Sequence, residues 1–166
     1  MASYRIRCAR MRDELARRGI VTTLYDRRDA PDLLVLSKRS DPASLDHALA
    51  LRELRTYRRI TGRDDQLPMM VDSERGMGRP ERALELGRSV PRASLPVPVQ
   101  VELAIAMSGA RLDLGHPEAA LAELEIPQLD PSVAYSWSPG LFDAYATVLE
   151  ELGRDDEAAE WLRRAD

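Results

Sequence analysis

Cysteine, histidine and aromatic residues are scarce in this 166-residue sequence. The chain has one cysteine, Cys8, and two histidines, and aromatic residues make up 5% of it. One cysteine excludes an internal disulfide framework, and two distant histidines do not suggest a metal site. No apolar run approaches the length of a membrane span, and the charged N-terminus does not resemble a signal peptide. We therefore expect a cytoplasmic protein with no metal, no cofactor and no membrane association.

Small and aliphatic residues are plentiful by contrast. Hydrophobic residues make up 44% of the chain, and with so few aromatics the core must consist mainly of Ala, Leu, Val and Met. Ala and Leu are strong helix formers, so the composition favours a mainly α fold. The length fits one domain with a small appendage.

The two parts of the chain differ in charge. Residues 1–60 hold 14 basic and 8 acidic residues, a net charge of +6. Residues 61–166 hold 10 basic and 20 acidic residues, a net charge of −10. Such asymmetry predicts two segments of different character, which we place at residues 1–44 and 45–166.

A short pattern recurs three times in the acidic part. A glycine is followed five residues later by an alanine, and the glycines are 37 and 38 residues apart. Glycine at the end of a helix adopts the left-handed conformation readily. The proline or aspartate two positions later suits the first turn of a second helix. The repeat therefore predicts stacked helix pairs, with turns at Gly78, Gly115 and Gly153 and close helix contacts at Ala83, Ala120 and Ala158.

These residues resemble the tetratricopeptide repeat (TPR), which carries a turn glycine and a small alanine where its two helices cross. The resemblance covers about residues 45–166 and implies a TPR-like α-solenoid of three to four helical hairpins. The first unit is degenerate, because Leu45 stands where the turn glycine belongs. A Pro-rich spacer at residues 94–99 and a long connector at residues 126–140 depart from the family pattern. The family's large apolar position on the second helix corresponds to Leu86-Gly87, Leu124 and Leu162.

Apolar periodicity predicts which helix faces are buried. Within residues 97–113 the predicted face consists of Val101, Ala104, Ile105, Ser108 and Leu112. In the last pair it consists of Leu141, Tyr145, Val148, Leu149 and Leu152, opposed by Ala158, Trp161, Leu162 and Ala165.

Residues 1–44 have a different pattern. A helix up to Gly19 is followed by strand-like runs at residues 20–25 and 33–36, and Asp41-Pro42 opens another helix. Residues 3–7 and 34–39 resemble the start of a Rossmann-type glycosyltransferase, which implies a small α/β segment. The opening strand and the donor-binding domain of that family are lacking. The segment is therefore either a remnant of a rearranged gene or a partner for another chain.

No residue set in the sequence predicts catalysis, so we expect a protein that is not an enzyme. His116 is expected to be an exposed turn residue, His47 a solvated one, and Cys8 a buried, inert thiol. Trp137 is expected to anchor the connector by packing. The run Arg52, Arg55, Arg58, Arg59 and Arg63 is interpreted as a solvated helix face rather than a site for nucleic acid or an acidic partner, since only Tyr57 accompanies it.

The family resemblance implies a groove lined by the first helices of the pairs. Five of its seven expected positions are acidic, which favours a basic peptide or protein segment as the partner and disfavours nucleic acid. An interpretation of equal weight is that these acids only keep the surface soluble. The predicted function is that of a protein-binding scaffold. Two alternatives remain, a glycosyltransferase fragment or subunit and a self-association module, which includes a homodimer. The groove positions are Asp72, Arg75, Glu102, Asp113, Asp143, Thr147 and Glu150.

Overall fold

The computed structural model describes residues 42–165. Those residues are mainly helical, as the composition predicts. The expected helix and strands before Asp41 lie outside the described residues, so the α/β segment stays a prediction. The described elements are α3 (Pro42–Thr61), α4 (Leu67–Gly76), α5 (Pro80–Gly87), a short 3-10 helix η1 (Arg92–Ser94), α6 (Val97–Asp113), α7 (Pro117–Leu124), α8 (Ser138–Glu151) and α9 (Asp155–Ala165).

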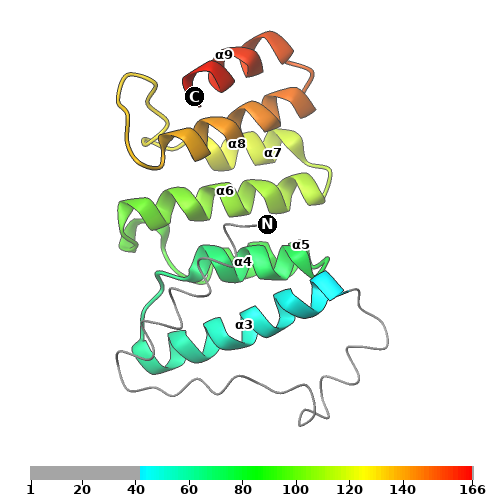
Figure 1. The fold of residues 1–166 in the computed structure, drawn as a ribbon, viewed down its shortest axis with the longest axis vertical. Helices are drawn as coiled ribbons and strands as arrows, with labels where there is room; N and C mark the ends of the chain where they lie inside the picture. Colours follow the sequence, from blue (N-terminus) through cyan, green and yellow to red (C-terminus); the bar gives the residue numbers. More distant parts are fainter. Residues whose placement is uncertain (1–41, 166) are drawn as a thin grey trace.

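The helices succeed one another along the long axis of the molecule, from α3 at one end to α9 at the other (Figure 1). Consecutive helices pack as the pairs α4–α5, α6–α7 and α8–α9, and α6 also contacts α4 and α8. Helix α3 packs against α4 and runs through Leu45 without a turn. The degenerate first unit therefore contributes one helix to the described part of the chain. None of the described helices combines the length and apolarity of a membrane span.

The three predicted turns have the same backbone geometry. Gly78, Gly115 and Gly153 have φ angles of 68°, 72° and 70°. In each turn the glycine N–H donates to the carbonyl three residues earlier, and the next N–H donates to the carbonyl five residues before it, at 2.8 to 3.0 Å. This pair of bonds is the Schellman motif, which satisfies carbonyls at the end of the preceding helix. The predicted role of the glycines is confirmed.

Helix α6 is buried on two sides, whereas its sequence pattern predicts one. Val101, Ala104 and Ser108 are buried as predicted, and Ile105 and Leu112 are half-buried. A second side of the helix packs against α4 and α5 through Leu103, Ala106, Met107 and Ala110. The one-sided prediction is therefore incomplete. A central helix covered on both sides carries apolar residues around most of its circumference, which weakens the periodicity.

Two other expectations need correction. The connector is shorter than predicted, because α8 already begins at Ser138. Pro139 suits the first helical turn, and the buried Ser138 hydroxyl accepts a hydrogen bond from the Tyr135 N–H at 3.0 Å. Leu162 was expected in the core but its side chain is 37% exposed, because no helix follows α9 in the described residues to cover it.

Trp137 has the packing role that the sequence predicts. Its ring is half-buried against the core formed by α6, α7, α8 and α9. On its other side it stacks on Tyr135, with ring centroids 4.6 Å apart and planes inclined by 11°. The connector is thereby fixed to the helices by an aromatic pair.

Candidate functional site

The predicted groove residues all fall on first helices of the pairs. Asp72 and Arg75 are on α4, Glu102 and Asp113 on α6, and the remaining three on α8. Glu102 is half-buried, whereas Asp143, Thr147 and Glu150 are exposed. Apart from Glu102, their side chains fall into two groups, one that joins α4 to α6 and one confined to α8.

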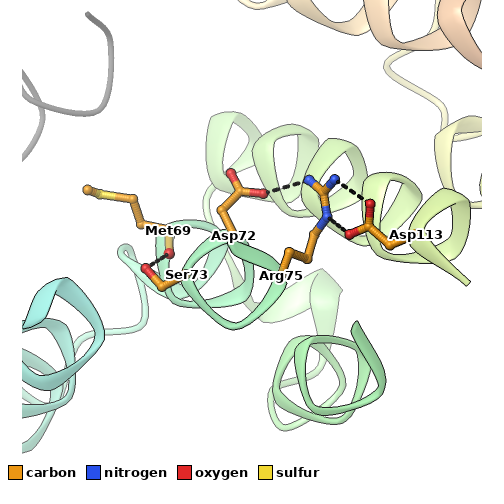
Figure 2. Close-up of polar contacts among 5 residues, drawn as sticks. All are labelled: Met69, Asp72, Ser73, Arg75 and Asp113. Atoms are coloured by element: carbon orange, nitrogen blue, oxygen red, sulfur yellow. Dashed lines mark hydrogen bonds and ion pairs between the residues drawn. The ribbon is translucent and has the colours of Figure 1, made fainter. Parts of the chain in front are cut away.

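In the first group Arg75 links two carboxylates (Figure 2). Its Nε and Nη2 donate to the two carboxylate oxygens of Asp113 at 2.8 and 3.2 Å. Its Nη1 donates to Asp72 Oδ1 at 3.1 Å. A bidentate arginine–carboxylate pair is both stronger and more directional than a single bond. It ties α4 to the C-terminal end of α6 across 38 positions in sequence.

Gly109 on α6 makes room for this bridge. A Cβ atom at that position would collide with the guanidinium of Arg75. Burial alone would lower the pKa of Arg75, but the hydrogen bond and charge of Asp113, together with Asp72, outweigh it and raise the pKa. Arg75 is therefore a fixed cation that crosses α6 at a glycine. The sequence pattern did not identify Gly109, because its partner is 34 positions away.

The second group lies on one side of α8. Asp143, Thr147 and Glu150 are spaced by four and three residues, so they share a helix face. The Thr147 hydroxyl donates to the backbone carbonyl of Asp143 at 3.0 Å. Asp143 and Glu150 have no ion pair within the described residues. This face consequently presents two carboxylates to solvent.

Glu74, near the end of α4, is a buried carboxylate that the sequence did not single out. Glu74 is 3% exposed, and its two oxygens lie 2.9 Å from Arg55 Nη2 on α3 and 3.0 Å from Arg79 Nε in the turn. A buried charge is tolerated when it is paired in this way. Glu74 therefore joins α3 to the α4–α5 turn through its ion pairs with Arg55 and Arg79.

The predicted arginine run is partly engaged in local ion pairs. Arg58 pairs with Asp64 at 2.6 Å, and Arg63 pairs with Asp65 at 2.9 Å. Tyr57, the aromatic residue within this run, is 3% exposed, and its hydroxyl lies 3.4 Å from Asp65. The run therefore offers no exposed aromatic ring for stacking against a base.

The two histidines differ in their surroundings. His116 is an exposed turn residue, as predicted. The expectation of a solvated His47 is wrong, since this side chain is half-buried and its ring lies where a Cβ of residue 76 would project. Gly76 at the end of α4 leaves the space that the ring occupies.

Within residues 42–165 no cluster of three or more histidine, cysteine or acidic side chains has the arrangement of a metal site. Comparisons with protein-family models, curated proteins and solved structures found no match. The function is therefore inferred from the chain's own surfaces.

Proposed function

We propose that the described helices form a TPR-like α-solenoid, and that the protein is a scaffold that binds a peptide or protein segment along the first helices of its pairs. Two features support this proposal. The same Schellman turn occurs three times at a nearly constant interval. The alanine that follows each turn glycine by five residues is 0% exposed at Ala83 and Ala120 and 1% exposed at Ala158, as close helix crossing requires.

The charge of the first helices favours a basic partner. On α4 and α6, Arg75 neutralises part of the charge of Asp72 and Asp113. On α8, Asp143 and Glu150 are exposed on one face with no cation paired to them in the described residues. This unbalanced pair is the observation that carries the charge preference, and a lysine- or arginine-bearing segment would complement it.

Binding of this kind is expected to depend modestly on each carboxylate. Exposed ion pairs contribute about 0.2–1 kcal/mol each, so two of them change a dissociation constant by about 2- to 30-fold. Much of the effect should fall on the association rate and should decline as salt is added.

The experiment uses the full chain and an array of dye-labelled peptides that carry lysine or arginine at varied spacings. The double variant Asp143→Ala/Glu150→Ala should weaken the best basic peptide by a factor in that range, measured by fluorescence anisotropy. A matched double variant, Glu85→Ala/Glu118→Ala, removes two exposed carboxylates from the second helices α5 and α7.

The control variant should bind nearly as tightly as the wild type, and both variants should retain the helical circular dichroism signal. Equal weakening by both double variants would show a diffuse charge effect instead of a groove. The absence of binding by any basic peptide would refute the preference for basic partners.

A further inference from the structure

The arginine bridge between α4 and α6 is not repeated between α6 and α8. Arg75 is the third residue before its turn glycine, Gly78, and Leu112 takes that place before Gly115 on α6. Leu112 is half-buried against the core that α6 shares with α7 and α8. An apolar side chain therefore stands where the preceding hairpin has a guanidinium.

The carboxylate that receives the guanidinium is repeated nevertheless. Asp113 is the second residue before its turn glycine, and Glu151 is the second residue before the next one. Asp113 accepts two hydrogen bonds from Arg75 (Figure 2). Glu151 is exposed and has no ion pair within the described residues. It is thus an open acceptor at the position where the chain itself, one hairpin earlier, binds a guanidinium.

The C-terminal end of α8 also lacks a cation of its own. This end of a helix has a partial negative charge, which cations stabilise and carboxylates destabilise. Helices α4 and α6 each carry an arginine in the last turn. Helix α8 has no basic residue and ends on Glu150 and Glu151. Arg154, in the turn that follows, pairs with Glu157 at 2.7 Å. An external cation at this end would therefore relieve a repulsion that the described residues leave in place.

Thr147 determines from which side a guanidinium can reach Glu151. It takes the place of Gly109, six positions before the turn glycine. At Gly109 a Cβ atom would collide with the guanidinium of Arg75. The Cβ of Thr147 therefore blocks the same crossing on α8, and a guanidinium has to approach Glu151 from the solvent side. A bound partner can supply it from there.

We propose that Glu151, with the charge of Glu150 beside it, is where an arginine of the bound segment docks, so that the partner supplies the guanidinium that Arg75 supplies one hairpin earlier. This inference rests on the proposed function and narrows the partner from a basic segment to one bearing arginine. Guanidinium forms two parallel hydrogen bonds with a carboxylate, as Arg75 does with Asp113. The ammonium group of lysine acts as a point charge and cannot reproduce this geometry.

The test uses the full chain and dye-labelled peptides that carry arginine, lysine or neutral citrulline at the same positions. By fluorescence anisotropy the arginine peptide should bind at least threefold more tightly than the lysine copy, and the citrulline copy should bind most weakly. Glu151→Gln should weaken the arginine peptide by about 2- to 5-fold, the range for one exposed ion pair. It should also reduce the preference for arginine over lysine.

Glu85→Gln is the matched control, because Glu85 is an exposed carboxylate near the end of the second helix α5 and has no ion pair within the described residues. It should leave the dissociation constant unchanged. Thermal melts of the free protein give a second measurement. Glu151→Gln should raise the melting temperature by about 1–4 °C, because it removes a charge that is unfavourable at the end of α8. Weaker binding together with higher stability distinguishes a binding role from a structural one.

The arginine assignment would be overturned by equal binding of the arginine and lysine peptides, or by equal effects of Glu151→Gln and Glu85→Gln. The proposed function would stand in that case if Asp143→Ala/Glu150→Ala still weakened binding, whereas the absence of binding by any basic peptide would refute both. A lower melting temperature of Glu151→Gln would show that this carboxylate already has a partner in the chain and would also overturn the assignment. So would self-association that Glu151→Gln abolishes, because the arginine would then come from a second copy.

Discussion

The two sides of α6 are held to their neighbours by different kinds of contact. Toward α4, an arginine crosses the helix at Gly109 and pairs with Asp113 near the protein surface, above an apolar layer. Toward α7 and α8 the contact is mainly apolar, with one ion pair between Arg111 on α6 and Glu123 on α7 at 3.5 Å. The same apolar core continues between α8 and α9, where the Trp161 ring lies 5.2 Å from Phe142 and 5.0 Å from Tyr145. The turns of the hairpins are alike, yet the interfaces between hairpins are individual. The hairpins of this chain therefore repeat the geometry of their backbone turns, but not the side-chain contacts between them.

The largest expected effect concerns the apolar side. Leu149 is 0% exposed in the core that α8 shares with its neighbours. Leu149→Ala should lower the free energy of unfolding by about 2–5 kcal/mol, because it removes buried methyl groups and leaves a cavity. Urea denaturation followed by circular dichroism measures this change. Leu162→Ala on the exposed face of α9 is the control and should cost about 0.5 kcal/mol or less. Similar losses for the two leucines would contradict the assignment of the core.

The next effect tests whether the three turns are equivalent. Gly78→Ala, Gly115→Ala and Gly153→Ala each place a Cβ at positive φ, but none of these atoms would meet a neighbour within 4 Å. The cost is therefore that of the backbone conformation alone, about 1–2 kcal/mol, and should be nearly the same at all three sites. Gly140→Ala, in α8 and equally open, should instead stabilise by up to about 1 kcal/mol. Unequal costs in the urea titrations would show that the turns differ in more than sequence.

The smallest expected effect concerns the bridge between Arg75 and Asp113, which crosses α6 at Gly109. Gly109→Ala should stabilise an Arg75→Ala background by about 1 kcal/mol through helix propensity. In the wild type the new methyl group displaces the guanidinium, so the gain should shrink by about 0.5–1 kcal/mol, the value of a partly exposed ion pair. A double-mutant cycle in urea measures this coupling. It should decline in 1 M salt, where charges are screened over about 3 Å. A coupling of zero at low salt would show that the bridge does not form.

Local sequence patterns predicted most of the helix ends and turns. The recurring glycine and the proline or aspartate after it predicted the three hairpins, because helix ends depend on a few neighbouring residues. The start of α3 at Pro42 and the acidic first turn of α9 followed from the same local rules. The alanines five residues after each glycine were expected at close helix contacts, because a small side chain lets two helices approach, and they are buried.

Features that depend on contacts between distant residues were not predicted from the sequence. The second buried side of α6, the half-buried His47 and the exposed Leu162 depend on which helices lie alongside. The arginine run was interpreted as a solvated face, and Arg52, Arg55 and Arg59 are indeed exposed on α3. An open hollow beside these arginines arises because Met77 and Arg79 approach α3 from the next hairpin.

The sequence by itself determined the helical character, the positions of the turns and the separation of basic and acidic parts, since these follow from intrinsic propensity and composition. The tertiary structure decided which charges meet. Arg75 is paired with Asp113, 38 positions further along the chain. Glu74 is paired with Arg55 and Arg79. Asp143 has no ion pair in the described residues. Coulomb interactions depend on distance in space, and that distance is set by the packing of whole helices.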